Sequence, residues 1–235
     1  MKKKYLLYIV STIVIVTSLV LIREKTLKNN LETVTKAYEK LIDSRGDVEY
    51  VKVTKNDGSY EEYYKDSETA IEQRDEYNKN NELKVREIFH KNEGKMSSIY
   101  NENGKFEGST TILSPQIAKE NKELENISLM ESMSNQYTTK YLKDKFKKVK
   151  NEDSSVTEYK SKTAKIYINK DTDTITKVES IHPSGKSEVI EYKKLKKGEK
   201  DLFRIDAKNN SNIDLSNVKL KEYMQEDINY ENVKG

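Results

Sequence analysis

Cysteine is absent from the chain, and apolar residues are scarce. With no cysteine among 235 residues, the fold stands without disulfides, and no thiol is available for lipid attachment. The hydrophobic content is 34%, whereas typical globular domains reach about 45–50% when glycine is counted. A chain this polar can bury one modest core rather than two large ones. We expect some of it to be flexible.

Signatures of catalysis and of cofactor binding are missing too. The only histidines, His90 and His182, are isolated residues at a strand end and in a turn. No G-x-S-x-G, H-E-x-x-H, P-loop or G-x-G-x-x-G motif occurs. Residues 169–176 (NKDTDTIT) imitate the start of a calcium loop, but Thr174 and Ser180 stand where that loop needs Gly and Glu. We expect no enzymatic activity, no cofactor and no metal site.

Charge is abundant but balanced, with 43 basic and 40 acidic residues and a net charge of +3. This balance argues against a nucleic-acid partner. Two basic runs stand out, KYLKDKFKKVK at residues 140–150 and KKLKKGEK at residues 193–200. Lysines at strand edges block edge-to-edge pairing of sheets. The alternative is attraction to anionic lipid or wall polymer.

One long apolar run exists, at residues 5–22, which are 18 consecutive residues without a charge. A bilayer core of about 30 Å needs roughly 20 such residues, and the flanking Lys4 and Arg23 can snorkel to the interface. Lysines at positions 2–4 place the N-terminus in the cytoplasm by the positive-inside rule. We therefore expect a single-pass signal anchor over residues 1–25 and an extracytoplasmic domain after it.

A cleaved secretory signal is the main alternative to a retained anchor. Such signals have a shorter apolar region that ends in small residues. Here only Val16, Thr17 and Ser18 fit a cleavage site loosely, and four more apolar residues follow them. Retention in the cell membrane is therefore the favoured interpretation.

The residues after the anchor predict one amphipathic helix and then many short strands. Leu27, Leu31, Val34, Tyr38 and Leu41 are spaced 4, 3, 4 and 3 apart, which forms one helical stripe. Strand segments then alternate with short turns up to residue 206, and short links favour antiparallel neighbours. A second helix is expected from the N-cap at residue 114, and a short polar helix is expected near residues 67–74.

These elements predict an α+β fold in which a curled antiparallel sheet of about eight to ten strands wraps around one or two helices. The sheet is expected to form a half-open barrel, because a twisted sheet of this size tends to curl. The domain is expected to span residues 26–206. Residues 207–235 are expected to form an Asn-rich C-terminal tail.

Residues 165–206 read KIYINKDTDTITKVESIHPSGKSEVIEYKKLKKGEKDLFRID. The order of strand, N-K-x-T turn, K-V-E strand, S-G-K turn, tyrosine-containing strand and closing L-F-x-I resembles the end of the periplasmic lipoprotein-carrier superfamily, the LolA/RseB-like proteins. The matching positions are Ile168, Asn169, Lys170, Thr172, Thr176, Lys177, Val178, Glu179, Ser184, Gly185, Lys186, Tyr192, Leu202, Phe203 and Ile205.

The resemblance implies a half-open β-barrel around helices, with a hollow that takes acyl chains or a domain that senses the envelope through a protein partner. Abundant Lys, Asn, Glu and Ile suggest a low-GC Gram-positive bacterium, and the apolar run at residues 5–22 suggests a membrane-anchored version of the family. Thr176 replaces the usual proline of the family's strand. A tethered domain cannot shuttle freely, so carrier activity does not follow from the resemblance.

Two hypotheses for function remain open. In the first, the concave sheet holds a lipid or other amphiphile. In the second, the domain binds an envelope protein through the C-terminal tail or a tyrosine-rich hairpin and binds no small molecule. The candidate partner surface consists of Tyr60, Tyr63 and Tyr64. The alternative for these tyrosines is that they take the place of Phe at the edge of the core. The candidate lining residues of the first hypothesis are Leu31, Val34, Tyr38, Leu41, Val85, Phe89, Ile112, Ile117, Ile166, Ile168 and Val178.

Overall fold

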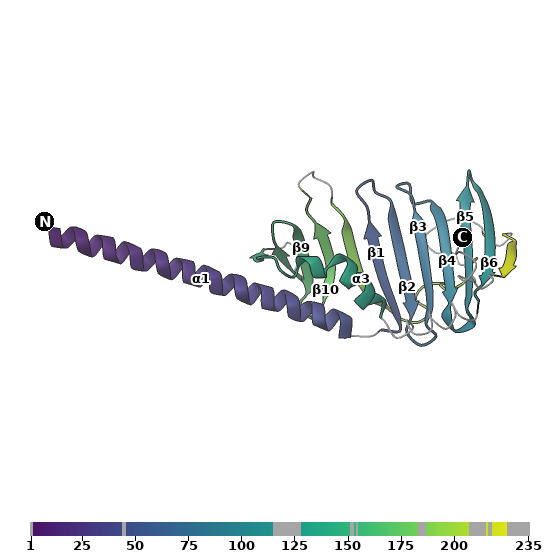
Figure 1. Cartoon of the computed structure of the whole chain (residues 1–235), viewed down its shortest axis with the longest axis horizontal. Coiled ribbons are helices and arrows are strands. Elements are labelled where there is room, and N and C mark those ends of the chain that lie inside the picture. Colours follow the sequence, from purple (N-terminus) through teal and green to yellow (C-terminus); the bar gives the residue numbers. More distant parts are fainter. Residues whose placement is uncertain are drawn as a thin grey trace, which may run out of the picture.

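A computed structural model of the chain describes residues 2–43, 46–114, 128–150, 153, 155–182, 187–206, 215 and 218–224, with side chains from residue 17 onward. These residues form an α+β fold in which a curled, mostly antiparallel sheet packs against two α-helices (Figure 1). The sheet has 12 strands, so the predicted eight to ten were too few.

The strand order is β12-β6-β5-β4-β3-β2-β1-β11-β10-β9-β8-β7. All neighbours are antiparallel except β12 and β6, which are parallel. The bounds are β1 (Val48–Thr54), β2 (Tyr60–Asp66), β3 (Ile71–Tyr77), β4 (Leu83–His90), β5 (Lys95–Glu102), β6 (Lys105–Ile112), β7 (Lys147–Val149), β8 (Val156–Lys160), β9 (Ala164–Asn169), β10 (Ile175–Ser180), β11 (Val189–Leu195) and β12 (Leu220–Met224).

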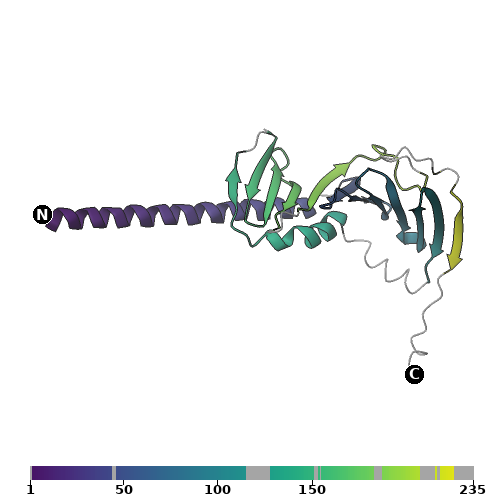
Figure 2. The same ribbon diagram turned by 90° about the horizontal axis from the view of Figure 1, so that it is seen from above.

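Helix α1 (Lys2–Asp43) is continuous over 42 residues, a length of about 63 Å at 1.5 Å per residue. Its first half projects beyond the sheet, and its last turns lie against it (Figures 1 and 2). The apolar run at residues 5–22 falls largely on positions 1–16, whose side chains are outside the described part. Within the described residues, no helix is long and apolar enough to cross a membrane.

Helix α3 (Leu129–Tyr137) is held at its start by a buried carboxylate. Ser128 caps the helix by accepting a hydrogen bond from the Glu131 amide. Glu49 on β1 accepts from the Ser128 hydroxyl at 3.0 Å and from the Met130 amide at 3.1 Å. A negative charge at a helix N-terminus is stabilising because it faces free amides and the positive end of the dipole. The N-cap predicted at residue 114 leads into residues 115–127, which lie outside the described part.

The main core lies between the two helices and the inner face of the curl. Val34 and Leu41 of α1 and Met130 of α3 are buried against Val51 on β1 and Val178 on β10. The α1 stripe predicted from the 4-3-4-3 spacing therefore packs on its own domain. Figure 2 shows α3 and the end of α1 under the arch of the sheet.

The outer face is covered by the chain that follows β11. Leu202 and Phe203 pack on Tyr50 and Tyr64, and further on Leu215 is buried in a second cluster. That cluster also contains Tyr60, Tyr77, Leu83 and Ile99. Part of the segment expected to be a tail thus joins the fold, because Leu215 is buried and β12 extends the sheet.

The short helix expected near residues 67–74 is wrong, because β3 begins at Ile71 and pairs with β2. The turn between them is built by Asp66, whose carboxylate accepts hydrogen bonds from the amides of Glu68 and Thr69 at 2.8 and 2.9 Å. Ala70 then takes a left-handed conformation with φ 56°. This capped turn reverses the chain where a helix would have continued it.

Candidate functional site

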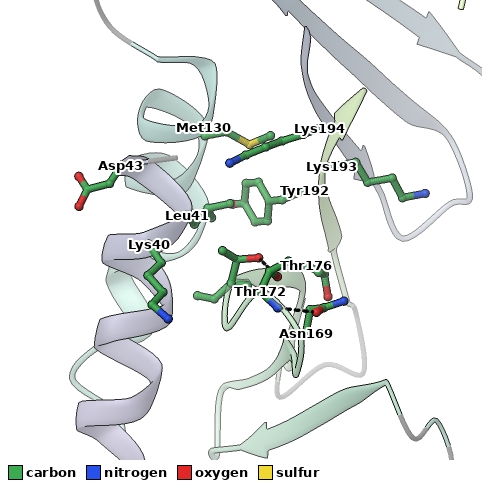
Figure 3. A pocket seen from close by; sticks show the side chains of 12 residues that line it. Lys40, Leu41, Asp43, Met130, Asn169, Thr172, Thr176, Tyr192, Lys193 and Lys194 are labelled. Atoms are coloured by element: carbon green, nitrogen blue, oxygen red, sulfur yellow. Dashed lines mark hydrogen bonds between the residues drawn. The ribbon is translucent and has the colours of Figure 1, made fainter. Parts of the chain in front are cut away.

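A pocket of about 570 Å³ opens between the C-terminal end of α1, the start of α3 and strands β9 to β11 (Figure 3). It is the site at which the two helices meet the sheet. Its lining residues are Lys40, Leu41, Asp43, Met130, Asn169, Thr172, Thr174, Ile175, Thr176, Tyr192, Lys193 and Lys194. Ligand pockets commonly measure about 300–1,000 Å³, so this pocket has room for a small molecule.

One wall of the pocket is apolar and rigid. Leu41, Met130, Ile175 and Tyr192 come from four different elements, and each is at most 3% exposed. Tyr192 is fixed by a hydrogen bond of 2.9 Å between its hydroxyl and that of Thr138. Burial raises the pKa of this phenol, so it stays neutral. These four side chains form a packed apolar wall behind the pocket, and they expose almost none of their own surface to it.

The rim of the pocket carries the charges. Lys40 of α1 forms an ion pair of 2.8 Å with Asp173 in the β9–β10 turn, which joins the helix to the opposite side of the opening. Figure 3 shows Asp43 and Lys193 pointing away from the middle, whereas Lys194 extends alongside Met130. Burial lowers the pKa of the Lys194 ammonium, and Glu49 acts in the opposite direction. Lys194 is thus the rim cation that reaches over the apolar wall.

The β9–β10 turn that forms one side of the opening is the segment that imitates a calcium loop. Asn169 holds it by accepting hydrogen bonds from the amides of Asp171 and Thr172 at 2.8 and 3.0 Å. Asp173 is left-handed with φ 54°. The segment is therefore a hairpin turn. Nowhere in the described residues do three His, Cys, Asp or Glu side chains gather as metal ligands would.

Seven of the predicted lining residues come together in the main core. They fill the inner hollow between the helices and the sheet rather than line an empty one, and Leu41 alone among them borders the pocket. Their role in binding a ligand stays a prediction. The seven are Leu31, Val34, Tyr38, Leu41, Ile166, Ile168 and Val178.

The other predicted lining residues lie elsewhere. Strand alternation on β4 places Val85 and Phe89 on the inner face of the sheet, together with Glu87. Both side chains are only half-buried, and neither belongs to a core cluster. Ile112 was wrong as a lining residue, because it alternates with Thr111 and faces outward on β6, where it is 37% exposed. Ile117 lies outside the described residues.

The three tyrosines expected to share a partner surface do not share one. Strand alternation places Tyr63 on the inner face and Tyr60 and Tyr64 on the outer face. Tyr64 is 1% exposed, and its hydroxyl donates to Glu62 at 2.8 Å. Tyr60 stacks on Tyr77 at 4.7 Å between ring centroids and is 8% exposed. The partner-surface prediction for this hairpin was therefore wrong, because two of the three rings are core residues.

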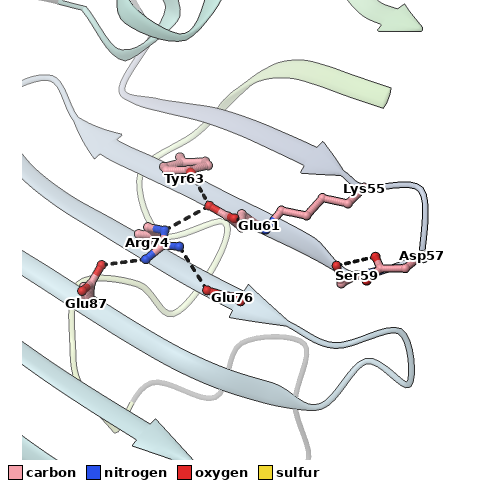
Figure 4. Close-up of polar contacts among 8 residues, drawn as sticks. All are labelled: Lys55, Asp57, Ser59, Glu61, Tyr63, Arg74, Glu76 and Glu87. Carbon is pink, nitrogen blue, oxygen red and sulfur yellow. Dashed lines mark hydrogen bonds and ion pairs between the residues drawn. The ribbon is translucent and has the colours of Figure 1, made fainter. Parts of the chain in front are cut away.

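A charged network follows the inner face beyond the helices (Figure 4). Arg74 donates to Glu61 at 3.1 Å, to Glu76 at 3.0 Å and to Glu87 at 3.0 Å. Burial alone raises the pKa of Glu61, but hydrogen bonds from Lys55, Tyr63 and Arg74 outweigh it and lower the pKa to about 2. Because three carboxylates already surround the guanidinium, the network holds strands β2 to β4 together and does not indicate an anion site.

Sequence reasoning missed most of the pocket, including Met130, Ile175, Tyr192 and Lys194. Tyr192 was singled out only as a position of the family resemblance. No periodicity marks these residues as a group, since they meet only after the sheet has curled around α1. No protein-family model and no curated protein matches the chain.

Proposed function

We propose that this chain is a membrane-anchored extracytoplasmic domain that holds a small amphiphile in the pocket between α1, α3 and strands β9 to β11. The observation that carries the proposal is a pocket of about 570 Å³ that is backed by packed apolar side chains, with a lysine, Lys194, extended beside it. A pocket with an apolar back suits a short alkyl chain or a ring, and the ammonium suits an anionic headgroup. The resemblance to LolA/RseB-like proteins, whose half-open barrels take acyl chains, supports the same class of ligand.

The proposed anchor is the apolar run at residues 5–22, with the N-terminus in the cytoplasm and the sheet outside. Support comes from the length of the run and from the three lysines that precede it. The full chain should stay in the membrane pellet after alkaline carbonate extraction, and a chain starting at residue 25 should be released. An intact mass that shows loss of the first 18 or so residues would instead establish a cleaved signal.

The amphiphile is tested by mass spectrometry of organic extracts from residues 25–235, secreted from a membrane-containing host and purified without detergent. A stoichiometric lipid or other amphiphile is expected. Thr174→Trp should abolish it, because the indole occupies the pocket that Thr174 borders. Asp171→Trp is the matched control: it lies in the same exposed turn but outside the lining. An empty, folded wild-type protein would overturn the proposal.

A second candidate function is supported by the free edge of the sheet. β12 is the last strand on that edge within the described residues, and Tyr223 and Met224 on it are 53% and 77% exposed. An exposed edge strand with apolar side chains can pair with a strand of another protein. Capture of a specific envelope protein that is lost on substitution of Tyr223, with no lipid in the extracts, would favour this alternative.

A further inference from the structure

A second cleft, of about 670 Å³, lies at the other end of the packed part of α1 and is bordered by an excess of positive charge. We call it the basic cleft. It is formed by α1, the loop that precedes β7, β7 itself and the turn between β8 and β9. Asp144 is the single acidic residue in its lining. The cationic side chains in the lining are Arg23, Lys143, Lys145, Lys147, Lys160 and Lys162.

These charges are not neutralised within the part of the chain that the structure describes. None of the six cations forms an ion pair with a described residue, although cations elsewhere commonly do, as Lys165 does with Glu179 at 2.9 Å. Asp144 accepts hydrogen bonds from the hydroxyls of Ser161 and Thr163, and its single negative charge offsets one of the six positive charges. A cleft lined mostly by one sign of charge raises the local positive potential and attracts anions.

The cleft is fixed rigidly to the helix that carries the proposed anchor. Arg23 and Leu27 are four residues apart, so they lie on the same face of α1. One turn further, the Asn30 side chain donates to the Phe146 carbonyl at 3.0 Å, which ties the lysine-rich loop to α1. The five lysines are exposed. Their distance from the end of the apolar run is therefore set by a continuous helix rather than by a flexible linker.

This distance matches the headgroup layer of a bilayer. The apolar run ends at Ile22, and Leu27 lies about 7.5 Å further along the helix at 1.5 Å per residue. The headgroup region on each side of a bilayer is about 5–8 Å thick. β7 is the edge strand of the sheet nearest to the projecting half of α1 (Figures 1 and 2). Arg23 and Leu27 thus fall within this layer, and the loop held by Asn30 lies about 12 Å beyond Ile22, from where its long lysine side chains can extend down to lipid phosphates.

We propose that the basic cleft binds the headgroup phosphate of an anionic phospholipid in the leaflet beside the domain. The inference rests on the proposed anchoring of α1 and is independent of what occupies the apolar pocket. Binding there fixes the rotation of the domain on the membrane, because the cleft lies on one side of the helix. Each lysine near an anionic surface contributes about a fivefold gain in affinity, so removal of three weakens binding roughly 100-fold.

The test uses the full chain in a neutral detergent and native mass spectrometry. Dioleoyl phosphatidylglycerol, dioleoyl phosphatidylcholine and inorganic phosphate are the three probes. The wild type should retain phosphatidylglycerol at least tenfold more tightly than phosphatidylcholine. The variant Lys143→Gln/Lys145→Gln/Lys147→Gln should lose at least tenfold in affinity for the anionic lipid.

The control variant, Lys36→Gln/Lys79→Gln/Lys196→Gln, removes three exposed lysines outside the cleft and should bind like the wild type. Equal binding by both triple variants, equal affinity for the two lipids, or displacement of the lipid by millimolar phosphate would overturn the inference. Loss of the anionic lipid with Thr174→Trp would place the lipid in the apolar pocket, which overturns the basic-cleft site and leaves the proposed function standing.

Discussion

The ion pair between Asp75 on β3 and Arg86 on β4 makes a strong prediction about stability. Both side chains are fully buried, and the guanidinium meets the carboxylate through two bonds of 2.8 and 2.9 Å. Asp75 also accepts from Gln73 at 3.1 Å and from Tyr77 at 3.3 Å. A third guanidinium nitrogen donates to the Ile205 carbonyl at 3.3 Å, so the pair ties the covering chain to the outer face of the sheet.

Arg86→Met should cost about 3–5 kcal/mol of unfolding free energy. The substitution removes two charge-assisted bonds, each contributing about 1.5–3 kcal/mol, and leaves the Asp75 carboxylate buried with only neutral donors among the contacts named above. Breaking a buried pair from one side typically costs that amount. The whole free energy of unfolding of a domain is only about 5–15 kcal/mol. The double variant Asp75→Leu/Arg86→Met removes both charges and should therefore be more stable than Arg86→Met alone.

The assay is urea-induced unfolding of the full chain in a neutral detergent, followed by tyrosine fluorescence, since the chain has 16 Tyr and no Trp. Lys105→Met is the control, because the Lys105–Glu107 pair spans 3.5 Å and its lysine is 80% exposed. Its effect should stay within about 0.5 kcal/mol. The reasoning is refuted if Arg86→Met costs less than about 1 kcal/mol, or if the double variant is less stable than the single one.

Three further predictions follow from local geometry. The pKa of Glu61 is lowered from 4.5 to about 2, so the contribution of its carboxylate to the free energy of unfolding is complete above pH 4.5 and is lost as the pH falls through 2. Glu61→Gln should therefore remove the dependence of stability on pH in that window and lower the free energy of unfolding by about 2–3 kcal/mol at pH 7. A Cβ on Gly108 would lie 2.6 Å from Leu220 and 2.9 Å from Ile99, so Gly108→Ala should loosen β12 and speed amide exchange in it at least tenfold. Asp66→Ala removes two bonds to turn amides and should cost about 1–2 kcal/mol in urea unfolding, and an unchanged midpoint would contradict the role given to this turn.

Local turn chemistry made much of the sheet predictable. The Asp57–Gly58 turn joins β1 and β2 as expected, with the Ser59 amide donating to Asp57 at 2.9 Å and Gly58 at φ 84°. Strand β3 was missed because its buried outer-face residues include polar Gln73 and Asp75, which give no apolar alternation. The parallel pairing of β12 with β6 was missed because no short turn connects the two strands. Two strands that are about a hundred residues apart in the sequence pair only when the rest of the fold brings them together.

The candidate site was less predictable than the fold for the same reason. The α1 stripe located Leu41, because a helix with one apolar face must pack that face against its domain. Met130 and Tyr192 reach the pocket from α3 and β11, where Glu49 holds the start of α3 and Thr138 holds the Tyr192 ring. The tyrosine-rich hairpin suggested a surface, but its outer face became a core once the chain after β11 covered it. The spacing of residues in the sequence predicts neither the placement of Met130 and Tyr192 nor the covering of the hairpin.

The continuous helix also limits how an amphiphile could reach the pocket. Leu41 lies 19 residues after Ile22, which is about 28 Å along α1, and a helix tilt of 40° shortens this height only to about 22 Å. The pocket therefore lies well above the headgroup layer of the proposed anchor membrane. An amphiphile bound at Leu41 must have left the bilayer entirely, whereas a lipid bound at Arg23 need not leave it. The two sites on one helix are thus suited to different tasks: the basic cleft to orienting the domain on its own membrane, and the apolar pocket to a molecule that is no longer part of that membrane.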